Sequence, residues 1–172
     1  MREIIWTMVV IGSLGLVSPV FADINEDLIE AAEGGDLEQV QELIEQGADV
    51  NYATDWGHTA LLEAARAGHI EICQLLVVAA ADVNASTTIG YTALLYAAEY
   101  GYTEIVQLLL AAGADLNVAD NSSYTALLYA AEYGHTEIVQ MLLAGGADLN
   151  VADNSGHTAL MWAAWNGHTE IA

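Results

Sequence analysis

The chain has 172 residues, enough for one domain with a substantial core, and its 55% content of hydrophobic residues argues against disorder. Only two basic residues, Arg2 and Arg66, face 24 acidic ones, so the formal net charge is -22. Such a surface repels phosphate backbones and anionic lipid headgroups, so we expect no nucleic-acid binding, no peripheral membrane binding and a basic protein partner. The same charge also fits plain solubility or adaptation to a salty medium.

Residues 1–22 have the features of a secretory signal peptide. Arg2 precedes an apolar stretch over residues 4–17, and small residues frame a cleavage site at Ala22. We therefore expect cleavage after Ala22 and a secreted or periplasmic protein. The alternative is an uncleaved signal that anchors the chain in a membrane, because the apolar run is nearly long enough to span a bilayer and Glu3 weakens the positive flank.

The rest of the chain repeats itself every 33 residues, as the motif TAL shows. This motif begins at Thr59, Thr92, Thr125 and Thr158. Such a period is typical of a solenoid of stacked helical units. The predicted units are an N-terminal capping repeat at 23–54, full repeats at 55–87, 88–120 and 121–153, and a truncated repeat at 154–172.

Each unit predicts two short helices, as YTALLYAAEYGYTEIVQLLLAAGADLN at residues 91–117 illustrates. Thr92 is a good N-cap for the first helix, and Gly101 can take the left-handed conformation that ends it. Thr103 can cap the second helix, and Gly113 stops it. Paired alanines in the first helix let neighbouring helices approach closely, and stacking of one unit on the next has to supply the core.

Cys73 is the only cysteine of the chain, so no intrachain disulfide can form. The equivalent residues of the next two units are Val106 and Val139. This substitution pattern predicts a small buried hydrophobe at Cys73 in preference to a reactive thiol.

The unit resembles the ankyrin repeat, whose signature is T-P-L-H-x-A over a 33-residue period. The matching segments are TAL-x-x-AA-x-x-G at 59–68, 92–101, 125–134 and 158–167, each followed by G-H/Y-x-E-I, with GAD-L/V-N closing the preceding units. The resemblance covers residues 23–172. It implies an all-α ankyrin-repeat solenoid of stacked helix-turn-helix units with hairpin-like loops.

Several positions depart from the family pattern. The family proline is replaced by alanine in every copy, and the family histidine is replaced by Leu62, Leu95, Leu128 and Met161, which predicts apolar packing between units. Ala80 and Ser123 stand where other copies have glycine; if the backbone is left-handed there, alanine costs about 1 kcal/mol. The sequence stops within an expected second helix, so we expect an uncapped apolar edge and a fragment of a longer array.

No residue spacing is typical of an enzyme, a cofactor site or a metal site, and we expect none of these. The five histidines lie in loops or after the glycines that end the first helices, too far apart to share a zinc ion. Repeated Asp-x-Asn pairs are interpreted as turns, in which side chains accept hydrogen bonds from nearby backbone amides. These pairs are Asp49-Asn51, Asp82-Asn84, Asp115-Asn117 and Asp148-Asn150.

Ankyrin-like proteins bind partners with their loop tips and with the concave side of the first helices, so the resemblance selects a partner-binding face. Its residues are Trp56, His58, Arg66, Ile89, Tyr91, Glu99, Tyr100, Tyr124, Glu132, Tyr133, His157 and Trp165. This aromatic and acidic strip would suit a basic or amphipathic protein. The alternative is that the stacked tyrosines only stabilise the array. We expect Tyr96 and Tyr129 to belong to the scaffold, with partial burial because Glu63 and Trp162 occupy the same position in other copies.

The leading functional hypothesis is a non-enzymatic protein-protein interaction module that acts outside the cytoplasm. A second hypothesis is an accessory or inhibitory repeat region of a larger enzyme or multidomain protein. A third is self-association through the uncapped C-terminal edge. The composition resembles that of secreted bacterial ankyrin proteins more than that of eukaryotic scaffolds.

Overall fold

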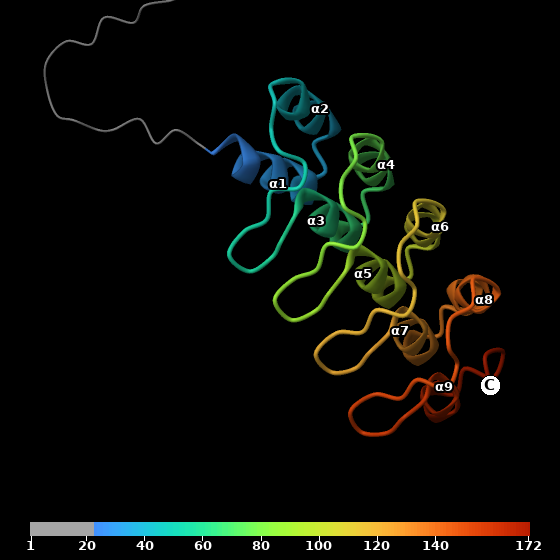
Figure 1. Cartoon of the computed structure of the whole chain (residues 1–172). Coiled ribbons are helices and arrows are strands. Elements are labelled where there is room, and N and C mark those ends of the chain that lie inside the picture. The colour runs from blue at the N-terminus through green and yellow to red at the C-terminus, as the bar shows by residue number, and fades with distance from the viewer. Residues whose placement is uncertain (1–22) are drawn as a thin grey trace, which may run out of the picture.

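The computed structural model describes residues 23–172, and the signal-peptide prediction for residues 1–22 lies outside them (Figure 1). The described part contains nine α-helices and, apart from isolated β-bridges, no strand pairing, which confirms the predicted all-α solenoid. The helices are α1 (Ile24–Gly34), α2 (Leu37–Glu45), α3 (Ala60–Ala67), α4 (Ile70–Val78), α5 (Ala93–Tyr100), α6 (Thr103–Ala111), α7 (Ala126–Tyr133), α8 (Thr136–Ala144) and α9 (Ala159–Asn166).

The helices form two rows, as Figure 1 shows. An inner row consists of α1, α3, α5, α7 and α9, each packed on the next, while α2, α4, α6 and α8 form an outer row on one side of it. The long loops that lead into α3, α5, α7 and α9 project on the other side, one above another. Each loop closes like a hairpin through a single antiparallel bridge in the last three copies, for example Ser86 with Thr92.

The helix boundaries follow from the capping residues, with one exception. The side chain of Thr92 accepts a hydrogen bond from Leu95 N, and Gly101 ends α5 with a φ of 78°, as predicted. The prediction that Thr103 caps α6 is wrong. The tight turn after Gly101 makes Tyr102 the N-cap residue, so Thr103 already lies inside the helix and no side chain caps it.

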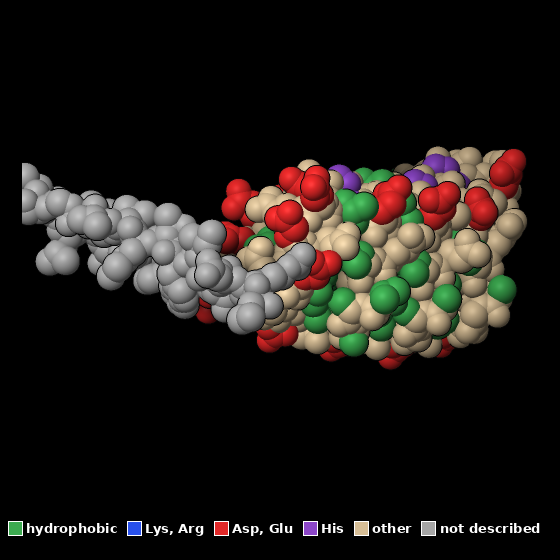
Figure 2. All heavy atoms as spheres, turned by 90° about the horizontal axis from the view of Figure 1, so that it is seen from above, with side chains coloured by type: hydrophobic (Ala, Val, Ile, Leu, Met, Phe, Trp, Pro, Cys, Tyr) green, Lys and Arg blue, Asp and Glu red, His purple; other side chains and the backbone are tan. Residues whose placement is uncertain are grey.

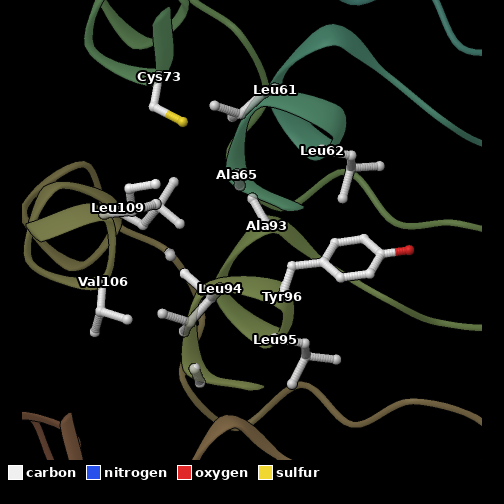
Figure 3. Close-up of a cluster of buried hydrophobic side chains, with 14 of the residues drawn as sticks. Leu61, Leu62, Ala65, Cys73, Ala93, Leu94, Leu95, Tyr96, Val106 and Leu109 are labelled. Carbon is white, nitrogen blue, oxygen red and sulfur yellow. The ribbon is translucent and has the colours of Figure 1, made fainter. Parts of the chain in front are cut away.

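The core is a stack of leucines and paired alanines between the two rows. Both alanines of each pair in α3, α5 and α7 are fully buried, which brings successive inner helices close together. Cys73 is also fully buried, as predicted, and burial raises the pKa of its thiol to about 12. Figure 3 shows Cys73 of α4 beside Leu61 of α3, with Leu109 of α6 below both.

Histidine rings link successive units by hydrogen bonds to carbonyl oxygens. Nε2 of His135 donates to Glu99 O over 3.0 Å, and Nε2 of His168 donates to Glu132 O over 2.9 Å. The ring of His135 also lies directly over Gly101, so close that a Cβ there would be 2.5 Å from its Cε1 atom. These histidines therefore hold successive units together, and the close packing of the His135 ring depends on glycine in the preceding unit.

Asparagine side chains form a second set of links between units, which the sequence analysis did not anticipate. The predicted Asp-x-Asn turns are present, since Asp82 accepts from Asn84 N over 2.9 Å. In addition, Oδ1 of Asn84 accepts a hydrogen bond from Asp115 N in the following unit over 2.8 Å. In the same way, Oδ1 of Asn25, Asn51 and Asn117 accepts from the backbone N of Asp49, Asp82 and Asp148, respectively.

Two residues carry backbone strain that glycine would avoid. Ala80 has a φ of 66° and Ser123 a φ of 65°, both in the left-handed region. Because the backbone at position 80 is left-handed, alanine there has the conformational cost expected from the sequence.

The last unit leaves apolar side chains uncovered on α9. Leu62, Leu95 and Leu128 are 1% exposed, which confirms the apolar packing predicted for this position. Met161, their equivalent, is 51% exposed, so the prediction is wrong there, because no described residue covers that side of α9. Leu149 and Leu160 are also more than half exposed, and together they form an apolar edge.

Candidate protein-binding face

The loop tips are held in register by backbone hydrogen bonds between units. Thr88 N donates to Trp56 O over 2.9 Å, and Asn121 N donates to Ile89 O over 3.0 Å. These bonds hold only the backbone in place. The side chains point to the solvent, with Trp56 71% exposed and Ile89 55% exposed. The face therefore presents large apolar side chains on a supported loop edge.

Behind the tips, the 33-residue period aligns side chains into three columns along the inner row. The loop column consists of His58, Tyr91, Tyr124 and His157. The buried column consists of Glu63, Tyr96, Tyr129 and Trp162. The charged column consists of Glu33, Arg66, Glu99, Glu132 and Trp165.

Tyr96 and Tyr129 of the buried column belong to the scaffold, as expected. They are only 8% and 7% exposed, so the partial burial expected for them is wrong. The hydroxyl of Tyr129 donates to Asp120 Oδ2 over 2.8 Å and accepts from the hydroxyl of Tyr91. Burial, these hydrogen bonds and the charge of Asp120 raise the pKa of Tyr129 far above its usual range. The tyrosine ring is thereby fixed in one position.

Two tyrosines of the loop column lie between scaffold and surface. The ring centroid of Tyr91 is 4.7 Å from that of Tyr96, and that of Tyr124 is 4.8 Å from that of Tyr129. Burial raises the pKa of Tyr91 to about 12. Both rings therefore support the helix behind them while one edge stays accessible.

The N-terminal end of the face contains an internal ion-pair cluster. Nη2 of Arg66 lies 2.6 Å from Glu33 of the preceding unit, and its Nε donates to Glu63 over 2.7 Å. Nδ1 of His58 also contacts the Glu63 carboxylate. Glu63 is only 4% exposed, and these two partners compensate its buried charge.

Further along the charged column, two carboxylates have no basic partner among the described residues. Arg66 is the only Lys or Arg between residues 23 and 172, and it is bound to Glu33 and Glu63. Burial and the charges of Glu132 and Asp120 raise the pKa of Glu99. Glu99 and Glu132 are therefore adjacent anions that no side chain of the described part neutralises.

The most exposed tyrosines flank these carboxylates. Tyr100 is 48% exposed and Tyr133 is 50% exposed, and they follow Glu99 and Glu132 directly in the chain. The face thus alternates accessible rings with unpaired negative charges.

A family model of ankyrin repeats, built on three copies, matches residues 28–120 and 113–172. The chain is an ankyrin repeat protein. No curated protein matches it significantly. Ankyrin repeats are general protein-protein interaction modules, so this ankyrin repeat protein has the architecture of a protein-binding domain.

The structure places the predicted face residues of this ankyrin repeat protein in two groups. Trp56, Ile89, Tyr100, Tyr133 and Trp165 are exposed, which is what a contact surface requires. The remaining seven are half-buried and also take part in internal contacts or flank them. These are His58, Arg66, Tyr91, Glu99, Tyr124, Glu132 and His157.

Sequence reasoning missed the carboxylates that orient the face. Asp120 accepts from Tyr129, and Asp153 accepts from Trp162 Nε1 over 3.0 Å. Aligning the units at 33 residues puts both aspartates four residues before the loop-column residue, where the two earlier copies have threonine. That change from threonine to aspartate, in the two units that carry Tyr129 and Trp162 in the buried column, was the available signal.

Within residues 23–172, no three His, Cys, Asp or Glu side chains are grouped so that they could hold a metal ion. None of the helices described is long and apolar enough to cross a bilayer.

Figure 2 shows one face of the molecule, on which acidic side chains in red gather along the upper edge and apolar side chains in green lie between the edges.

Proposed function

We propose that this ankyrin repeat protein is a non-enzymatic binding module that acts outside the cytoplasm and recognises a basic or amphipathic protein surface. The observation that carries the proposal is the pair Glu99 and Glu132, which lie side by side in the charged column without a basic partner in the described part. A partner that supplies lysine or arginine there gains attraction and relieves the repulsion between the two carboxylates.

The exposed aromatic side chains support the same face. Trp56, Tyr100, Tyr133 and Trp165 are each between 48% and 73% exposed. Tryptophan and tyrosine are enriched among the residues that dominate binding energy, because they bury a large area at a low cost in side-chain entropy. These rings and the two carboxylates together fit a partner with both apolar and basic groups.

The location proposed for the protein depends on residues 1–22. Their short apolar stretch after Arg2 and the small residue Ala22 support export and cleavage after Ala22. Mass spectrometry of the protein recovered from the medium or periplasm tests this directly. The proposal requires a chain that starts at Asp23, and recovery of the uncleaved chain from membranes would contradict it.

Affinity capture tests the binding function. The protein is used as bait against extracellular or periplasmic proteins, and its variant Tyr100→Ala with Tyr133→Ala is compared with Val78→Ala. Val78 is a suitable control because it is 85% exposed and lies on α4 of the outer row. We expect partners that the control retains and the tyrosine variant loses. Partners retained equally by both would refute the proposed face.

Self-association is a second candidate function, favoured by the apolar edge at α9. Leu149, Leu160 and Met161 are each more than half exposed, and a cavity of about 180 Å³ opens between α9 and the unit before it. Sedimentation velocity over a range of concentrations tests it. We expect dimers that Leu160→Glu abolishes, and a monomer at all concentrations would refute this candidate.

A further inference from the structure

The candidate protein-binding face ends in an aromatic groove, which consists of Tyr124, His157, Trp162 and Trp165. The rings of Trp162 and Trp165 are nearly parallel, at 17°, with centroids 5.8 Å apart. His157 meets both rings edge-on, at 5.2 and 5.8 Å. The groove has a volume of about 380 Å³ and is lined in addition by Asp153 and serine side chains. It is large enough for the end of a long side chain.

The groove is fixed from below by a buried carboxylate. Oδ1 of Asp153 accepts from Ser155 N and His157 N over 2.8 and 2.9 Å, and Oδ2 accepts from Trp162 Nε1 over 3.0 Å. Burial raises the pKa of Asp153, but these hydrogen bonds lower it more, so the pKa lies below its usual range. A negative charge therefore lies at the N–H edge of the Trp162 ring.

A second carboxylate, that of Glu132, is near Tyr124, which lines the groove. Burial and the charges of Glu132 and Asp153 raise the pKa of Tyr124. The end of α9 is held against the same residue, since Asn166 Nδ2 and His168 Nε2 both donate to Glu132 O, over 3.0 and 2.9 Å. The groove thus combines tryptophan faces with two anions.

An internal contact at equivalent positions of the first two units shows that an arginine side chain fits this part of the face. At the N-terminal end, the guanidinium of Arg66 reaches Glu33, the equivalent residue of the preceding unit, and also Glu63 of the buried column. At the C-terminal end, Glu132 is equivalent to Glu33, but Trp165 stands in place of Arg66. The carboxylate is retained there, and the internal guanidinium is replaced by an aromatic ring that is 73% exposed.

We propose that the groove binds an arginine side chain of the partner, with its guanidinium on the tryptophan rings and hydrogen-bonded to Glu132. This inference rests on the proposed function and adds the chemistry of one contact. Arginine suits the groove better than lysine because its planar cation stacks on an indole and donates to a carboxylate in its own plane.

NMR of the ¹⁵N-labelled protein tests the groove with two probes of equal charge. One is the blocked peptide Gly-Arg-Gly-Arg-Gly, and the other is its lysine counterpart. We expect the arginine peptide to shift the indole signals of Trp162 and Trp165 more than that of Trp56, and to bind more tightly than the lysine peptide. Trp165→Ala should weaken arginine binding by about two- to thirtyfold, the range expected for a cation on a tryptophan face. Val78→Ala is the control and should bind as the wild type does.

The outcomes separate this inference from the function on which it rests. Equal binding of the two peptides, or no effect of Trp165→Ala, would overturn the arginine site while leaving a face that still depends on Tyr100 and Tyr133. Conversely, captured partners could bind the tyrosine variant as well as the wild type while Trp165→Ala no longer binds the arginine peptide. That result would support the groove and refute the proposed face.

Discussion

Replacing Gly101 by alanine should destabilise the protein much more than the same change at Gly113, although both glycines are left-handed, with φ of 78° and 88°. A Cβ at Gly101 would lie 2.5 Å from Cε1 and 2.7 Å from Nδ1 of His135 in the next unit. A Cβ at Gly113 would have no atom within 4 Å. Comparing Gly101→Ala with Gly113→Ala therefore separates the cost of backbone strain from the cost of a clash between units.

The expected magnitudes follow from these distances. At Gly113, a left-handed alanine costs about 1–2 kcal/mol, offset by about 0.4–1 kcal/mol from the stiffer unfolded chain, so the net loss is about 1 kcal/mol. At Gly101, displacing His135 adds overpacking of about 1–3 kcal/mol and weakens its hydrogen bond to Glu99 O, worth about 1 kcal/mol. The total loss is then about 3 kcal/mol.

Urea denaturation followed by circular dichroism measures these losses as changes in the free energy of unfolding. The double variant Gly101→Ala with His135→Ala removes the clash, so its loss should fall short of the sum of the single losses by about 2 kcal/mol. Losses at Gly101 and Gly113 that agree within about 0.5 kcal/mol would refute the packing of His135 on Gly101.

Ala80→Gly should stabilise the protein by up to about 1 kcal/mol in the same urea assay, because it relieves the left-handed strain; a loss of stability would contradict the positive φ of 66°. Cys73, whose thiol pKa is raised to about 12, should not react with a thiol reagent at neutral pH until the protein unfolds. Rapid labelling of the folded protein would show that it is accessible. The raised pKa of Glu99 means that the folded state holds its proton more tightly than the unfolded chain. Stability should therefore fall as pH rises from the usual carboxyl pKa through the raised one, and Glu99→Gln should reduce that dependence.

The helical scaffold could be predicted because its determinants are local and repeated. Thr92 and Gly101 mark the ends of α5 by capping chemistry that needs no knowledge of neighbours. The buried alanine pairs recur in phase, so stacking followed from the period alone. Thr103 was misassigned because the turn after Gly101 starts the helix one residue earlier than the capping rule suggested, with Tyr102 at the N-cap position.

The details of the face could not be predicted, since they depend on pairs from different units. Glu63 is buried only because Arg66 and His58 lie beside it, and an isolated glutamate gives no sign of that. Likewise, Asp120 looks like a turn residue until Tyr129 is placed against it. Glu99 lacks a basic partner because the one arginine of the described part pairs with Glu33 and Glu63, and these pairs are visible only in the folded chain.

The affinity for a captured partner, compared between the wild type and Tyr100→Ala with Tyr133→Ala, tests the central claim most directly. If these half-exposed rings form the contact surface, the affinity should fall by about tenfold or more, while the melting temperature should change by less than about 4 °C. An unchanged affinity together with a large fall in melting temperature would contradict the claim, because it would assign both rings to the scaffold.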